Sequence, residues 1–85
     1  MGACQELIFD HVGRAQFECV AARAQSAGLP INGDSGEAEE KGFTIRWDFS
    51  ESTGTLRIQC LDSPILFPCT AINGKIASIV EGCRG

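Results

Sequence analysis

The sequence predicts an α+β fold, with a small, mainly antiparallel sheet of about four strands in β-α-β-β-β-α order and two helices packed on one face. Two observations favour this fold. Residues 43–61 contain two runs in which apolar and polar side chains alternate, and two other segments, 10–28 and 68–83, place apolar side chains at helical spacing. A chain of 85 residues builds one small core, so we expect residues 1–85 to form a single domain.

The first two predicted elements are a short strand at 5–9 and a helix at 10–28. The strand, QELIF, is apolar at one end and directly precedes the helix. From Phe17 onwards, apolar side chains recur near i, i+3, i+4, i+7 and i+10, which forms a narrow apolar stripe on the helix. Asp10 is the predicted N-cap, and Gly28 suits the position after the last helical turn.

Residues 31–41 are predicted to turn and then to form an edge strand. Glycine and aspartate in the first half favour a turn. The second half, GEAEEK, carries charges that discourage association of sheet edges. Gly42 then allows a tight turn into the next strand. A helical turn is the alternative for GEAEEK, because Glu, Ala and Lys favour helix.

Residues 43–61 predict a hairpin with a defined register. A four-residue loop at 51–54 pairs apolar residues on one face and opposite charges on the other. The apolar pairs are Phe49 with Leu56, Trp47 with Ile58, and Ile45 with Cys60. The charged pair is Asp48 with Arg57. A slip of one residue would turn one apolar set outward, so both faces specify the same register. Trp47 is expected in the core, where its indole N–H needs an acceptor.

The tail, from Pro68 to Cys83, admits two structures. Ile72, Ile76, Ile79, Val80 and Cys83 share one helical face, and Pro68 suits a first helical turn. Against this, the dipeptide Asn73-Gly74 is a strong hairpin signal and is unfavourable inside a helix. Five matched positions outweigh one dipeptide, so the prediction is a helix.

Charge and motifs exclude several function classes. The net charge is −4 and the seven basic residues are scattered, which argues against nucleic acid and against an anionic membrane surface as partners. No phosphate-binding loop, nucleophile elbow or zinc-protease motif is present. The acidic segment from Asp34 to Glu40 does not match a calcium-binding loop. His11 is expected as a surface or capping residue. We therefore expect no metal, no cofactor and no enzymatic activity.

The five cysteines are interpreted as free thiols in the cytoplasm. They occupy positions 4, 19, 60, 69 and 83, without a C-x-x-C motif, and the N-terminal ten residues lack the pattern of a secretory signal. The hairpin register places Cys60 on the core face. The segment from Cys60 to Cys69 is therefore predicted to be a strand-to-helix connection that contains two prolines.

Three hypotheses for function follow. The leading one is a small non-enzymatic interaction or regulatory protein that self-associates, or binds a protein partner, through an apolar segment that contains Leu61, Ile65, Leu66 and Phe67. The second is a thiol-dependent redox or sensor protein that uses Cys60 and Cys69, with Cys83 as a further candidate. The third is a protein that holds a small apolar ligand between sheet and helices.

Overall fold

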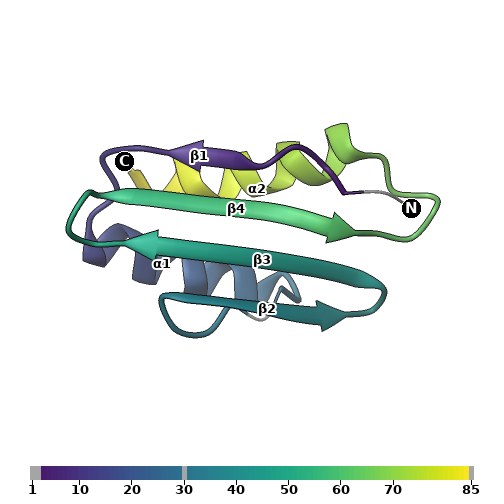
Figure 1. Cartoon of the computed structure of the whole chain (residues 1–85), viewed down its shortest axis with the longest axis horizontal. Helices are drawn as coiled ribbons and strands as arrows, with labels where there is room; N and C mark the ends of the chain where they lie inside the picture. Colours follow the sequence, from purple (N-terminus) through teal and green to yellow (C-terminus); the bar gives the residue numbers. More distant parts are fainter. Residues whose placement is uncertain (1–2, 30, 85) are drawn as a thin grey trace.

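The computed structural model describes residues 3–29 and 31–84. These residues form β1 (Leu7–Phe9), α1 (Arg14–Ser26), β2 (Ser35–Glu40), β3 (Phe43–Ser50), β4 (Thr55–Asp62) and α2 (Cys69–Arg84). The strands build one antiparallel sheet in the order β1-β4-β3-β2. Both helices lie on the same face of this sheet (Figure 1). The predicted α+β fold is confirmed.

The hairpin of β3 and β4 has the predicted register. Asp48 lies opposite Arg57 on the outer face, where Arg57 forms an ion pair with Glu6 at 3.7 Å. The three apolar pairs are Ile45 with Cys60, Trp47 with Ile58, and Phe49 with Leu56. All six of these side chains are buried against the helices. The alternation of the sequence therefore specified both the pairing and the buried face.

The start of α1 differs from the prediction. The helix begins at Arg14, with Gly13 as its N-cap, so Asp10 is not the cap. The Gly13 N–H donates to the side-chain oxygen of Gln16 at 2.6 Å. His11 adopts a left-handed backbone conformation that brings Val12 into the core, where Val12 is 2% exposed. Burial of Val12 by tertiary packing therefore delays the helix beyond the position that local sequence favours.

The end of α1 and the edge strand follow the predictions. Gly28 has a positive φ of 90° just after the helix, a conformation that glycine adopts without strain. The segment predicted as an edge strand forms β2, which pairs with β3 only. Lys41 and Gly42 both have positive φ and make the tight turn between β2 and β3. Gly36 in β2 lies close to the Trp47 ring: a Cβ atom there would be 3.0 Å from it, so a larger residue would require the indole to shift.

The tail forms α2, so the helical alternative is confirmed and the Asn73-Gly74 hairpin does not form. Ile72, Ile76, Ile79 and Val80 are buried on one face of α2. The Asn73 side chain donates to the Gln5 carbonyl at 3.2 Å, which links α2 to the N-terminal segment. Packing of the isoleucine face therefore overrides the poor helical propensity of the dipeptide.

The core lies between the inner sheet face and the two helices. Phe17 of α1 stacks on Phe49 of β3 with ring centroids 4.5 Å apart. Trp47 is buried, as predicted, and its indole N–H donates to the Gly33 carbonyl at 3.0 Å. The indole therefore has the hydrogen-bond acceptor that burial requires.

Candidate functional site

Four of the five cysteines form disulfides, so the expectation of free thiols is wrong for them. Cys4 is bonded to Cys69, and Cys19 is bonded to Cys83. The partners are 65 and 64 residues apart in sequence, but their Cα atoms lie only 5.4 and 5.8 Å apart. Sequence spacing contained no sign of these pairs, because helix and strand packing alone brings them together.

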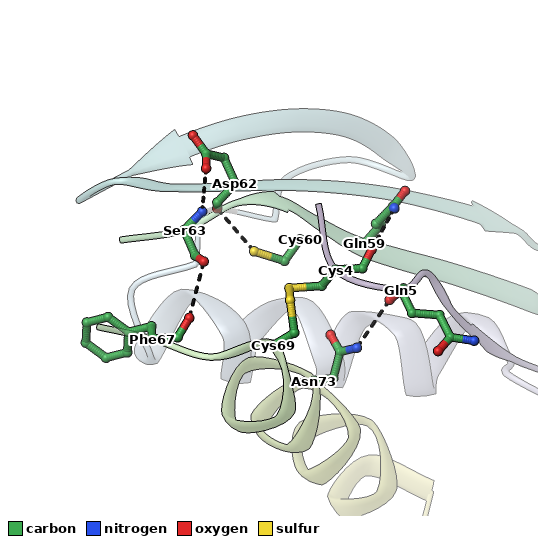
Figure 2. The surroundings of a disulfide bond; sticks show 9 residues. All are labelled: Cys4, Gln5, Gln59, Cys60, Asp62, Ser63, Phe67, Cys69 and Asn73. Atoms are coloured by element: carbon green, nitrogen blue, oxygen red, sulfur yellow. Dashed lines mark hydrogen bonds between the residues drawn. A yellow bond between two sulfur atoms is a disulfide. The ribbon is translucent and has the colours of Figure 1, made fainter. Parts of the chain in front are cut away.

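Cys60 is the free cysteine, and it is buried with an exposed fraction of 0%. It does not bond to Cys69. Instead, its thiol donates to the Asp62 carbonyl at 3.2 Å (Figure 2). Its own carbonyl accepts the Cys4 N–H at 2.8 Å. Burial raises the pKa of the Cys60 thiol, which lowers the reactive thiolate fraction at neutral pH. The environment of Cys60 therefore does not favour a thiol-dependent function, and Cys69 and Cys83 lie in different disulfides.

The sequence-predicted interface falls into two parts. Leu61, at the end of β4, is half-buried. The following segment, Ile65–Phe67, which we call the apolar loop, is exposed: Ile65 by 77%, Leu66 by 86% and Phe67 by 49%. Side chains of this size are mostly buried in globular domains, so three in a row at the surface form an unusual feature. The structure therefore places Leu61 outside the exposed part of the predicted interface.

Hydrogen bonds and a disulfide hold the apolar loop in place. The Phe67 N–H donates to the Pro64 carbonyl at 3.0 Å, which closes a turn. Ser63 is buried beneath the loop, and its hydroxyl donates to the Phe67 carbonyl at 3.3 Å (Figure 2). Two residues after Phe67, Cys69 is bonded to Cys4. The exposed side chains therefore project from an ordered turn.

An apolar cleft of about 340 Å³ lies beside this loop. It lies between the residues just after α1, the first turns of α2, and the start of β3 with the turn before it. Phe67 forms one wall together with Phe43, their rings meeting edge to face with centroids 5.1 Å apart. The small residues Ala27 and Gly28 on one side and Ala71 on the other leave the space open. The cleft therefore follows from small side chains where the two helices face each other.

Charged residues surround the mouth of the cleft. Lys41 and Lys75 line it together with Glu40. Neither lysine forms an ion pair with another residue that the structure describes. Although the whole chain carries a charge of −4, the charged lining of this cleft is positive by one.

A second charged group lies at the opposite end of the domain. Arg14 donates to both carboxylate oxygens of Asp34 at 2.6 and 2.8 Å, and to Glu51 at 2.7 Å. These hydrogen bonds raise the pKa of Arg14 and lower that of Asp34. The Arg14 guanidinium also lies over the ring of Phe49. The group joins α1, the loop before β2 and the β3–β4 turn, and this arrangement is a structural clasp.

Among the residues that the structure describes, no arrangement of side chains supports metal binding. No group of three or more His, Cys, Asp or Glu side chains there is placed to hold a metal ion. The acidic residues of β2 extend along an exposed edge strand, and Asp34 is held by Arg14. His11 is exposed in the connection before α1.

Comparisons with protein-family models, curated proteins and solved structures gave no match for this chain. No helix in the described ranges is long and apolar enough to span a membrane. The candidate site therefore rests on its own geometry: the apolar loop, the adjoining cleft and the lysines at its mouth. Sequence reasoning found the loop through its run of apolar residues. It also proposed an apolar ligand between sheet and helices, but it did not identify the residues that line the cleft, which come from separate segments.

Proposed function

We propose that this protein is a small non-enzymatic interaction protein that self-associates through its apolar loop. The observation that carries this proposal is the exposure of Ile65 and Leu66, at 77% and 86%. Moving a side chain of this kind out of water stabilises a complex by about 1.5–3 kcal/mol when burial is complete. The loop is already ordered, so little further entropy is lost when it is covered.

A second copy of the chain is the partner that the surroundings of the loop favour. In a two-fold dimer the same patch lies on both sides of the interface, so it must be complementary to itself. At the centre of such an interface, the apolar side chains of the two copies contact each other. At its border, beside Phe43, Glu40 and Lys41 are neighbours of opposite charge. A two-fold axis allows each acid to face the base of the other copy, which favours self-association over a partner of one charge.

The loop is small compared with a standard interface, which buries about 800 Å² on each partner. We therefore expect a weak dimer, with a dissociation constant between about 10 µM and 1 mM. Sedimentation velocity across that concentration range tests this expectation. The wild-type sedimentation coefficient should rise with concentration towards that of a dimer.

A matched pair of variants tests the surface. Leu66→Asp should keep the protein monomeric throughout the range. Ile8→Asp is the control, because Ile8 is also an exposed apolar residue, at 54%, but lies on β1, away from the loop. It should dimerise like the wild type. A wild-type chain that remains monomeric at about 1 mM, or an equal loss of dimer in both variants, would contradict the proposal.

We expect a protein partner rather than nucleic acid or membrane, because the net charge is −4. The sequence favours a cytoplasmic location. The two disulfides support a different proposal, that the protein works in an oxidising compartment. Alkylation of the protein in acid-quenched cells, followed by mass spectrometry, distinguishes the two locations. One alkylated cysteine is expected in an oxidising compartment, and five would support the cytoplasm.

A further inference from the structure

We infer that the apolar cleft binds a single-chain anionic amphiphile, such as a fatty-acid carboxylate, with its chain in the cleft and its head group at the two lysines. This inference concerns the cleft and does not require self-association, although Phe67 and Lys41 contribute to both surfaces. Three features carry it: the size and lining of the cleft, its position between the helices, and the charges at its mouth.

The size and lining of the cleft suit one hydrocarbon chain. Its volume of about 340 Å³ lies at the low end of the range of ~300–1,000 Å³ for small-molecule sites. The floor is Ile45 of β3, and the walls include Leu29, Phe43, Phe67, Ile72 and Ile76. No carboxylate or amide side chain lies among these wall residues. An unbranched apolar chain therefore leaves no buried polar group without a hydrogen-bond partner.

The position of the cleft gives a ligand direct access to the core. Ile45, Leu29 and Ile76 line the cleft and also a much smaller void of about 10 Å³ deeper between the helices and the sheet. The helices are joined covalently through Cys19, in the middle of α1, and Cys83, near the C-terminal end of α2. Figure 1 shows that α1 and α2 run in opposite directions, so the start of α2 lies away from that bond. The start of α2 is held by the Cys4–Cys69 disulfide, so the end of α1 is the side of the cleft that can adjust to a chain.

The charges at the mouth select the head group. Lys41 lies in the β2–β3 turn and Lys75 lies on α2, so two exposed lysines from separate segments line the same cleft. Neither is neutralised by an ion pair with a described residue. Glu40 is the single acid in the lining. A carboxylate gains two attractive partners there, whereas a quaternary ammonium head group meets net repulsion.

Isothermal titration calorimetry of the disulfide-bonded full chain tests the inference, with ligands kept below their micelle-forming concentrations. Dodecanoate should bind with one site per chain. Decanoate should bind about tenfold more weakly, because each lost methylene reduces affinity three- to fourfold. Dodecyltrimethylammonium should bind at least about tenfold more weakly than dodecanoate. Equal binding of the cationic and anionic chains, or no binding of dodecanoate up to its solubility, would overturn the inference.

Two matched pairs of variants locate the site. Ala71→Phe places a bulky ring in the cleft from an exposed helical position and should reduce dodecanoate affinity at least about tenfold. Ser78→Phe is its control, because Ser78 is exposed on the same helix and does not line the cleft. The double variant K41E/K75E should weaken dodecanoate similarly, whereas R46E/R57E makes the same charge change on the outer sheet face and should have little effect. Equal effects within either pair would contradict the inference.

The Leu66→Asp variant separates this inference from the proposed self-association. Leu66 does not line the cleft, so the monomeric variant should bind dodecanoate with wild-type affinity. If dodecanoate fails to bind while the wild type still dimerises, only the ligand site is wrong. If the wild type is monomeric and dodecanoate still binds to a site that Ala71→Phe blocks, only the proposed dimer is wrong.

Discussion

The two ends of this domain are built differently. At the end where α1 begins, Phe17 stacks on Phe49, Arg14 clasps two carboxylates, and the Cys19–Cys83 disulfide joins the helices. We call this the closed end. At the open end, α1 finishes and α2 starts, the apolar loop projects, and a cleft separates the helices. The disulfide there joins α2 to the N-terminal segment rather than to α1.

This difference separates the part of the domain that holds the helices together from the part where the apolar residues are exposed. A chain of this size has a small core and depends on additional constraints. Here one disulfide fixes the helix pair at the closed end, and the other fixes the start of α2 without closing the space beside α1. The residues proposed to bind partners and ligands are therefore concentrated where the helices are not joined to each other.

The largest expected effect is the loss of a disulfide. The two bonds close loops of nearly equal length, 65 and 64 residues, so chain entropy predicts that each contributes about 4 kcal/mol to the free energy of unfolding. Urea denaturation of C4S/C69S and C19S/C83S measures this contribution. Nearly equal losses are expected for the two variants. A difference of more than about 2 kcal/mol would show that local packing, not loop closure, decides the stability of the two ends.

The next effect compares core residues from the two ends. Leu56 pairs with Phe49 near the closed end and is 0% exposed, whereas Ile72 lines the cleft and is 9% exposed. Leu56→Ala should reduce the free energy of unfolding by about 3 kcal/mol, and Ile72→Ala by about 2 kcal/mol, because the space at Ile72 already opens to solvent. Urea denaturation at one pH measures both values. The reverse order would contradict the assignment of a closed and an open end.

Cys60 reports on local opening of the open half. It is buried opposite Ile45, and burial raises the pKa of its thiol. Labelling with a thiol reagent at neutral pH should therefore be on the order of 100-fold slower in the native protein than in guanidinium. If Cys60 is labelled at the same rate in native Leu56→Ala as in the native wild type, the reagent reaches it by local opening. Global unfolding is more frequent in that variant, so labelling through global unfolding would be faster. Rapid labelling of the native wild type would show that the thiol is not buried in solution.

The smallest expected effect is a pH dependence at the closed end. Hydrogen bonds from Arg14 hold the pKa of Asp34 below its ordinary value of 3.8. Ionised Asp34 therefore stabilises the fold at pH values above its ordinary pKa, and this contribution is lost as pH falls through the lowered pKa. The effect is small because both side chains are substantially exposed. Compared with Asp34→Asn, the wild type should have a higher urea midpoint at about pH 6, and the difference should decrease as the pH falls below 3.8. A difference in urea midpoint that stays constant with pH would show that ionised Asp34 does not stabilise the fold through Arg14.

Part of the candidate site was predictable from the sequence. The sequence predicted an interface at Leu61, Ile65, Leu66 and Phe67, and the structure exposes the last three and half-buries Leu61. The cleft was not predictable, because Phe43, Phe67 and Ile72 belong to separate segments and meet only in the folded chain. The same holds for Lys41 and Lys75, which are scattered charges in the sequence but border one opening in three dimensions.

The sequence by itself determined the hairpin of β3 and β4 and its register, because periodicity and turn chemistry act over a few residues. It left an alternative open for β2 and for α2, and packing of the isoleucine face against the core decided α2. Tertiary structure decided the cysteine partners, which are more than 60 residues apart, and the delayed start of α1, where burial of Val12 outweighed capping by Asp10. It also created the open end, because a cleft depends on which side chains meet across the fold. Local signals fix the elements, and long-range packing fixes the surfaces between them.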